Sequence, residues 1–161
     1  MPALLLNPIM ILALVANGLL AGLFFVFAVA IGPAMRRLDD SIYVHTFRAI
    51  NSAILNGRFL AVFFAAPIAA VACAALHFWR GGSAPMLPTV AGAVCSVLTF
   101  GITAAGNVPL NNALERAPVH TEAQRRSARQ HFEMPWNRRN LARSGTSTGA
   151  IVFLAIALAS G

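Results

Sequence analysis

The sequence is poor in charged residues and contains no lysine. Only 11% of its 161 residues are charged, whereas a water-soluble domain of this size carries about a quarter. Hydrophobic residues make up 58% of the chain, and its mean hydropathy is +0.70. The scarcity of charge argues against an ordinary soluble domain and indicates an integral membrane protein.

The sequence also has few cysteines and no familiar catalytic or nucleotide-binding motif. Cys73 and Cys95 both fall within long apolar stretches, where a disulfide is not expected, and no zinc-ligand spacing exists. The apolar stretches contain no aspartate or glutamate, which argues against a proton-coupled transporter. Neither a phosphate-binding loop nor a Ser-His-Asp arrangement can be found.

Four apolar stretches have about the length of a membrane span, at residues 9–31, 59–79, 87–106 and 142–160. A bilayer core of about 30 Å requires about 20 helical residues at 1.5 Å each. The sequence therefore predicts an all-α fold, an antiparallel integral membrane four-helix bundle in a single domain over residues 1–161. Ala28-Val29-Ala30 resembles a signal-peptidase site, but residues 1–8 carry no basic residue, so we expect the first helix to be retained.

The basic residues are distributed unevenly among the polar segments. Eleven of the twelve lie between the first and second spans, or between the third and fourth together with the first turn of the fourth, where Arg143 stands. The connection between the second and third spans holds only Arg80. In a chain with four spans, the first and third connections lie on the same side of the membrane. Arginine-rich connections remain in the cytoplasm. We therefore expect a multi-pass protein of the cytoplasmic membrane with both termini extracytoplasmic. This topology explains the pI near 11.5, so membrane lipids rather than nucleic acid are the expected partners.

Both arginine-rich connections contain helical patterns. Apolar residues recur with a helical rhythm in the first connection, at Ile42, Phe47, Ile50 and Ile54. We expect an interfacial helix there, with Ser41 as a suitable cap. In the second connection, Thr121 and Gln124 have the spacing of a capping box, which predicts a polar helix to about Phe132.

Proline and glycine indicate helix boundaries and packing contacts. We expect the first span to begin after Pro8 and to end at Gly32-Pro33. Two G-x-x-x-G pairs predict close helix packing and possible faces for oligomerisation, namely Gly18 with Gly22 and Gly145 with Gly149.

Polar side chains gather at the expected cytoplasmic ends of the spans. Trp136, Asn140 and Arg143 are spaced i, i+4, i+7, so one helical face presents all three. An indole, carboxamides and a guanidinium would suit a planar aromatic ligand that carries oxygen atoms. Alternatively, the tryptophan and arginines are interface anchors and the asparagines cap helix ends. The candidate substrate-binding residues are Asn107, Asn111, Trp136, Asn137, Asn140 and Arg143.

The segment Asn107-Val108-Pro109-Leu110-Asn111, followed by Trp136-Asn137 and Arg143, resembles a pattern of the anthrone oxygenase-like family of small four-span membrane proteins. The opening residues 18–25 and the Gly32-Pro33 step are also similar, so the resemblance covers nearly the whole chain. It implies a four-span fold. For members linked to polyketide pathways, it implies oxidation of an anthrone to an anthraquinone by molecular oxygen without an obvious cofactor.

Two functional hypotheses follow. In the first, the chain is a cofactor-independent monooxygenase in which His45 or His131 is the base, the asparagines and Arg143 hold the oxyanion, and Trp136 stacks on the rings. Molecular oxygen is then the co-substrate, and no metal is expected because the histidines lack a metal-binding spacing. In the second, the chain is a non-enzymatic membrane protein that binds a lipid, a quinone or another hydrophobic small molecule, or supports a partner protein.

Overall fold

The computed structural model describes residues 2–81 and 86–160, and all regular secondary structure in these residues is helical. The elements in chain order are α1 (Pro2–Val26), the π-helical segment η1 (Phe27–Ile31), α2 (Gly32–Met35), α3 (Asp40–Ile54), α4 (Gly57–Trp79), α5 (Met86–Ile102), the π-helical segment η2 (Thr103–Asn107), α6 (Val108–Arg116) and α7 (Glu122–Ala159). The short connection between the second and third spans falls largely on residues 82–85, outside the described residues.

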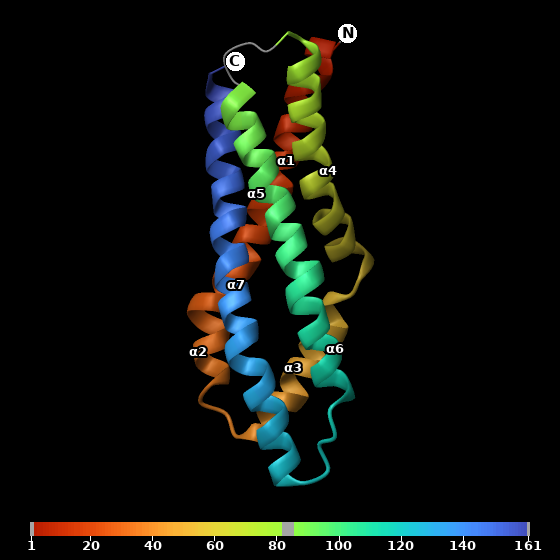
Figure 1. Ribbon diagram of the computed structural model, residues 1–161, viewed down its shortest axis with the longest axis vertical. Helices are drawn as coiled ribbons and strands as arrows, with labels where there is room; N and C mark the ends of the chain where they lie inside the picture. The colour runs from red at the N-terminus through yellow and green to blue at the C-terminus, as the bar shows by residue number, and fades with distance from the viewer. Residues whose placement is uncertain (1, 82–85, 161) are drawn as a thin grey trace.

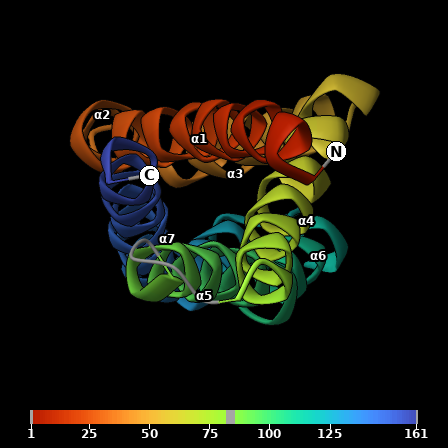
Figure 2. The ribbon, with the colours of Figure 1, turned by 90° about the horizontal axis from the view of Figure 1, so that it is seen from above.

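The long helices form an antiparallel bundle, which confirms the predicted all-α four-helix fold. Each of α1, α4 and α5 packs on the next long helix, and α7 packs on both α5 and α1, so the ring is closed (Figure 2). Both ends of the chain lie at one end of the bundle, with α3 and α6 at the other (Figure 1). By length and composition, the four helical stretches Leu6–Met35, Gly57–Trp79, Met86–Arg116 and Glu122–Ala159 can each cross a membrane.

The first helix begins earlier than expected, at Pro2 rather than after Pro8. A proline at the first helical position loses nothing, because its missing N–H would have no partner there. Pro8 forfeits only a backbone bond to residue 4, close to the helix start, so it does not interrupt the helix.

The two spans that contain Pro33 and Pro109 continue past these prolines, contrary to the expected ends at Gly32-Pro33 and Gly106. Each proline follows a π-helical segment, in which the N–H of Gly32 donates to the Phe27 carbonyl and the N–H of Val108 to that of Thr103. The extra residue of a π turn gives the proline ring room that a regular α turn lacks, because the ring would otherwise meet the carbonyl four residues back. The chain therefore stays helical on both sides.

The helix α3 in the first connection packs on α6 and α7. It starts after Asp39, whose carboxylate accepts from the Ile42 N–H at 2.9 Å, so Asp39 and not Ser41 is the cap. Asp39 has the extended backbone that a cap requires, whereas Ser41 already lies in the first turn. Tyr43 and Phe47 are buried, which means that the apolar face of α3 meets protein.

The capping box predicted at Thr121 and Gln124 is present, and it opens α7. This helix does not end near Phe132 but runs for 38 residues to Ala159, straight through Pro135. Phe132 and Trp136, on either side of the proline, are both buried, and their packing outweighs the one backbone bond that Pro135 removes. The polar helix and the fourth span are therefore one element.

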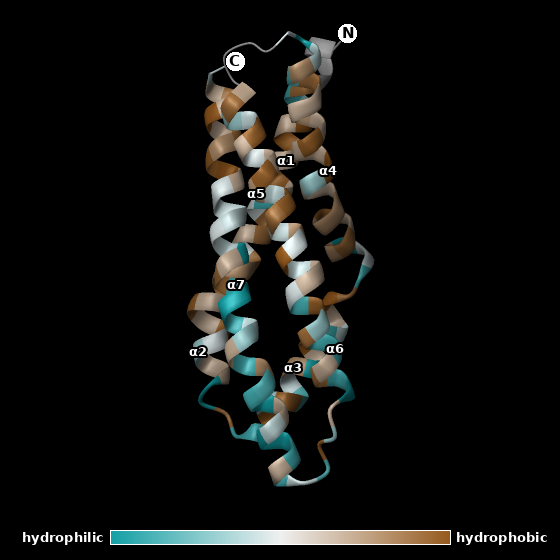
Figure 3. Cartoon of the chain, viewed as in Figure 1, coloured by the Kyte–Doolittle hydropathy of each residue, from teal (hydrophilic) through white to brown (hydrophobic). Residues whose placement is uncertain are grey.

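Small and aromatic side chains fill different levels of the bundle. Near the termini the core is made of Met10, Ala13, Ala70, Cys73 and Leu154. At the opposite end an aromatic core gathers Phe27, Tyr43, Phe47, Phe132 and Trp136. Hydrophobic residues dominate the part of the bundle nearer the termini, and hydrophilic residues dominate the end that holds α3 (Figure 3). This division suits a bundle whose arginine-rich end leaves the membrane.

The glycine pairs differ in what surrounds them. Gly149 packs on α5, because a Cβ built there would lie 3.3 Å from the Cys95 Sγ. Nothing lies within 4 Å of a Cβ built at Gly18, Gly22 or Gly145. Gly149 therefore serves packing inside the bundle, and oligomerisation through the other glycines stays a prediction.

Candidate functional site

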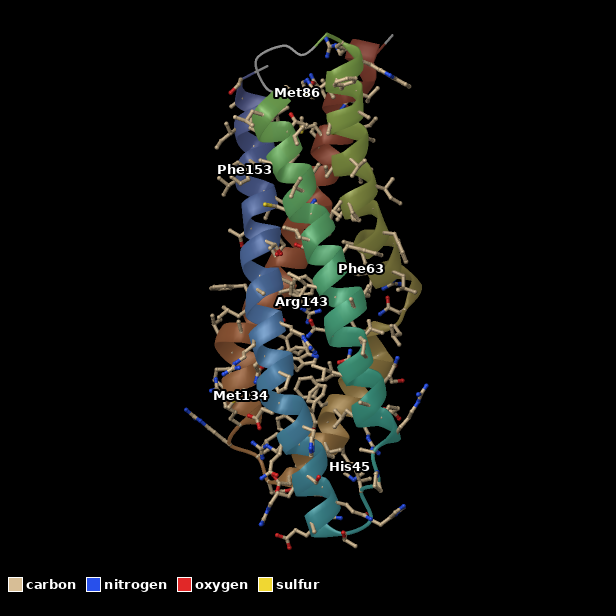
Figure 4. All side chains as sticks on the ribbon, viewed as in Figure 1. His45, Phe63, Met86, Met134, Arg143 and Phe153 are labelled. Carbon is tan, nitrogen blue, oxygen red and sulfur yellow. The ribbon has the colours of Figure 1, made fainter. Side chains whose placement is uncertain are left out.

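The predicted face of α7 points into the bundle. Trp136, Asn140 and Arg143 are 4%, 1% and 7% exposed, and Arg143 projects into the interior between the helices (Figure 4). Two glycines at the π-helical segments allow α7 to approach closely: a Cβ at Gly32 would lie 3.3 Å from Asn137, and one at Gly106 would lie 2.9 Å from Arg139.

The Arg143 guanidinium lies against two aromatic rings. Its central carbon is 4.0 Å from the ring centre of Phe24 and 5.1 Å from that of Trp136. Its Nε and Nη2 donate to the Asn140 Oδ1 at 3.2 and 3.1 Å. No carboxylate among the described residues lies within salt-bridge distance of it, and a buried cation without a counter-ion is costly. The surroundings of Arg143 therefore favour an anion or an electron-rich ligand.

Asn140 links this cation to the first span. While its Oδ1 accepts from Arg143, its Nδ2 donates to the Phe24 carbonyl at 3.0 Å. The amide orientation is fixed because only the nitrogen can donate to a carbonyl. Asn140 thus positions Arg143 without neutralising its charge.

Further amides surround Trp136. The indole Nε1 donates to the Asn111 Oδ1 at 2.9 Å, and the Asn107 Nδ2 lies 3.4 Å from the Trp136 carbonyl. The Asn107 Oδ1 and the Asn51 Nδ2 are buried and have no hydrogen-bond partner in the part of the chain that the structure describes. An unsatisfied buried polar group costs about 1–3 kcal/mol. One free acceptor and one free donor therefore lie near the tryptophan.

A cavity of about 60 Å³ lies beside these groups. Its walls include Phe24, Asn51, Asn111, Trp136 and Arg143, together with apolar residues of α1, α3 and α4. Ligand pockets for drug-sized molecules measure about 300–1,000 Å³. In this conformation the cavity therefore holds water-sized molecules rather than a ring system.

The other three predicted site residues lie elsewhere. Asn137 faces Gly32 and borders a surface hollow with Arg36 and Glu133. His45 is exposed on α3, and His131 is exposed on α7 (Figure 4 labels His45). Neither histidine lines the cavity beside Arg143, so their role as bases stays a prediction.

His131 borders a separate, mainly apolar pocket of about 410 Å³ between α6 and α7. Its Nδ1 lies 2.7 Å from the Ser127 carbonyl oxygen. A carbonyl only accepts, so the neutral ring carries its proton on Nδ1 and keeps Nε2 as the acceptor. That tautomer is the one in which Nε2 can take up a proton.

Two arginines join the helices around the site. From the sequence, only a role in membrane orientation was expected for them. Arg129 bonds Glu133 at 2.7 Å and Asp40 at 3.1 Å, and it also donates to the carbonyls of Leu38 and Arg36. Its guanidinium carbon lies 4.4 Å from the centre of the Tyr43 ring. The i,i+4 spacing of Arg129 and Glu133 in the sequence indicates an ion pair on one helix. Nothing in the sequence indicates the backbone carbonyls that Arg129 also bonds.

Arg48 makes a similar connection between α3 and α6. It donates to the carbonyls of Leu114 and Ala117, at the end of α6 that lacks intrahelical partners. Phe24 and Asn51, which both line the cavity, were likewise absent from the predicted site. A lone phenylalanine or asparagine in a helix carries no sequence signal that distinguishes a site residue from a packing residue.

Burial also affects the one tyrosine of the chain, Tyr43. Loss of hydration raises the pKa of its phenol above the ordinary value, with a further rise from Glu133, while Arg129 and Arg36 act in the opposite direction. Tyr43 is therefore a neutral part of the aromatic core at physiological pH.

The comparisons with known proteins give one match. No curated protein and no solved structure matches the chain. The family model described as anthrone oxygenase matches residues 52–153, more than half of the chain. That region includes Asn107, Asn111, Trp136, Asn140 and Arg143 and leaves α1 outside. The chain belongs to the anthrone oxygenase family.

Proposed function

We propose that this protein oxidises a planar phenolic or anthrone-type aromatic with molecular oxygen at the arginine-rich end of the bundle. For an anthrone, one O₂ is consumed, the methylene carbon becomes a carbonyl, and one water leaves. The observation that carries the proposal is the buried Arg143 cation, which faces a cavity, stacks on aromatic rings and lacks a carboxylate partner.

Arg143 supplies what the first chemical step needs. Removal of a proton from the methylene carbon of an anthrone places negative charge on its oxygen, and a fixed cation in a water-poor site stabilises that charge. The same cation favours the deprotonated form of a bound phenol. The resulting electron-rich anion passes an electron to O₂, and the two radicals join in a C–O bond at the former methylene carbon. The peroxide anion takes back the removed proton, and cleavage of its O–O bond with loss of water gives the quinone.

Asn51, Asn107 and Trp136 provide the remaining contacts. The unpartnered Asn51 Nδ2 lines the cavity and can donate to a second substrate oxygen. Asn107 does not line the closed cavity, so its Oδ1 would accept from a phenolic hydroxyl only in an open form. Trp136 is held by Asn111, so its ring is already oriented to stack. These groups fit a ligand with both donor and acceptor oxygens.

The substrate needs more room than the closed cavity offers. Ile54 and Leu55 line the cavity at the α3–α4 corner, and Leu55 is 67% exposed. We propose that this corner moves to admit the substrate, since a connection between helix ends absorbs such a change most easily. The predicted bases His45 and His131 lie outside the closed cavity, so either would act only on a substrate at the entrance or in the open form.

One observation favours non-enzymatic binding as a second candidate. The described residues that line the cavity include no histidine, aspartate, glutamate or cysteine that could remove a proton. In that case Arg143 and the amides would bind a quinone or another oxygen-bearing hydrophobic molecule without turnover.

We also propose the cytoplasmic membrane as the location, with the arginine-rich end in the cytoplasm and both termini outside. The distribution of arginine supports this orientation. Cysteines are placed one at a time at exposed Arg37, at exposed Arg126 and near the C-terminus, in a background without Cys73 and Cys95. A membrane-impermeant maleimide should label the first two only from the cytoplasmic side and the third only from outside. Labelling of all three from one side would contradict the proposed orientation.

The test of activity is oxygen uptake and quinone absorbance with a model anthrone, using chelator-treated protein in lipid nanodiscs. Uncatalysed oxidation is subtracted with heat-denatured protein. We expect Arg143→Gln to lower kcat/KM by about 10²–10³-fold, as for loss of an oxyanion donor. The matched control is Arg37→Gln, an exposed arginine on the same end, with unchanged activity. Equal rates for wild type and folded Arg143→Gln would remove Arg143 from the mechanism, and quinone binding without turnover would establish the second candidate.

A further inference from the structure

A shallow, open groove lies on the outer face of the bundle between α5 and α7. Its apolar part is formed by Val97, Leu98, Gly101, Ile102 and Ala105, and its volume is about 740 Å³. It lies apart from the Arg143 cavity, which is lined by different residues. Both helices can cross a membrane by length and composition, and in that case a groove on their outer face would lie against lipid.

The floor of the groove is open. Nothing lies within 4 Å of a Cβ built at Gly101. Val97 and Ala105 are eight residues apart, so the apolar part extends about 12 Å along the helix axis. A groove of this length and polarity suits a hydrocarbon chain.

One end of the groove is basic. Arg138 and Arg139 line it, both are exposed, and neither forms a salt bridge with a described residue. The Arg139 side chain crosses Gly106, where a Cβ would lie 2.9 Å from its Cδ, and its Nη1 donates to the Gly106 carbonyl at 3.0 Å. This arginine is therefore held at the groove end with other N–H groups free.

We propose that this groove binds one anionic phospholipid, with an acyl chain along Gly101 and the phosphate on Arg138 and Arg139. A neutral lipid would fill the apolar part equally well, but only an anionic headgroup compensates two adjacent guanidinium groups. Arginine favours phosphate because its planar fork of donors matches the phosphate oxygens. Basic sites between membrane helices commonly select anionic lipid in this way.

The proposal is independent of the oxidation chemistry and is tested by lipid binding alone. Detergent-purified full-length protein is titrated with phosphatidylglycerol or phosphatidylcholine, and bound lipid is counted by native mass spectrometry while thermal unfolding is followed in parallel. We expect one tightly retained phosphatidylglycerol, a higher Tm, and at least tenfold weaker retention of phosphatidylcholine.

Two kinds of variant separate the contribution of the lipid headgroup from that of the acyl chain. Arg138→Gln combined with Arg139→Gln should reduce retention of phosphatidylglycerol at least tenfold, and Gly101→Leu should reduce it by filling the groove. The matched controls are Arg37→Gln, which removes an exposed charge elsewhere, and Gly145→Leu, which enlarges another open glycine. Both controls should retain the lipid as wild type does.

Three results would overturn the proposal. These are equal retention of the two lipids, loss of phosphatidylglycerol in the control variants to the same extent as in the groove variants, and full competition by inorganic phosphate. The last result would mean that the arginines bind a free anion and that the apolar groove contributes nothing.

Discussion

The Asn140 Oδ1 accepts from both the Nε and the Nη2 of Arg143, so a neutral amide stands where a carboxylate would complete a salt bridge. Asn140 thereby orients the guanidinium but does not compensate its positive charge, which stays available to an anionic ligand.

Asn140→Asp tests that arrangement directly. The substitution keeps the size of the side chain but supplies a counter-ion to Arg143, and it removes the donor to the Phe24 carbonyl. We expect the oxidation rate of a model anthrone to fall at least tenfold, because Arg143 no longer attracts the substrate oxyanion. Asn112→Asp, at an exposed position of α6, should leave the rate within twofold of wild type. A fully active Asn140→Asp variant would show that the net charge of Arg143 is irrelevant to turnover.

Arg129→Gln should destabilise the arginine-rich end. It removes charge-assisted bonds to Glu133 and Asp40 and the bonds to two backbone carbonyls, and we expect a loss of about 1.5–3 kcal/mol in the free energy of unfolding. Arg126→Gln is the matched control, since its side chain is 61% exposed and its surface ion pairs are worth about 0–1 kcal/mol. Denaturant unfolding in mild detergent measures both, and equal losses would contradict the stabilising role of the buried Arg129 bonds.

Tyr43 should resist ionisation. Its pKa lies above the ordinary value of about 10, so tyrosinate absorbance near 295 nm should remain absent as the pH rises past 10. Because Tyr43 is the one tyrosine of the chain, this signal reports on it alone, and Tyr43→Phe gives the baseline.

The sign of the coupling to stability follows from the same shift. Below pH 10 the phenol is neutral in folded and unfolded chains, whereas above it the unfolded chain loses the proton first. Stability contributed by Tyr43 is therefore full below pH 10 and declines as the pH rises further. A midpoint of titration at the ordinary value in the folded protein would contradict the burial of this side chain.

Gly92→Ala should lower the stability of the fold markedly, although it adds only one methyl group. An added Cβ would lie 2.7 Å from the Cγ of Leu154, which is fully buried, and overpacking of a core costs about 1–3 kcal/mol. Gly22→Ala has nothing within 4 Å and should be neutral or slightly stabilising, because alanine is the better helix former. Thermal unfolding of the two variants compares them, and equal midpoints would place α5 and α7 farther apart than described.

Local patterns in the sequence were sufficient to predict the helical bundle and the face of α7 that contributes to the site. Span length and hydropathy predict the four helices, and the i, i+4, i+7 spacing places Trp136, Asn140 and Arg143 together. The Thr121 capping box is also a local pattern. The face of α7 and the capping box depend on residues within about two turns of one another, and each span depends on the hydropathy of one continuous stretch.

The features that the sequence did not predict depend on contacts between distant segments. Proline is normally a stop signal, and only the packed structure accommodates Pro33 and Pro109 behind π turns. The direction of Asn137 is set by Gly32, on another helix, and Arg129 finds acceptors some ninety residues away. The distance of His45 and His131 from the cavity likewise reflects how α3 and α7 pack.

The length of α7 sets the depth of Arg143. Its 38 residues extend about 57 Å, roughly twice a hydrocarbon core of about 30 Å. Arg143 lies sixteen residues before Ala159, about 24 Å along the axis from the end near the termini. In the proposed orientation, this distance places Arg143 within the depth of the lipid tails, close to their cytoplasmic boundary. A hydrophobic molecule dissolved in the bilayer reaches that depth by lateral diffusion. Its partition coefficient into the bilayer, more than its aqueous concentration, would therefore govern how often it reaches Arg143.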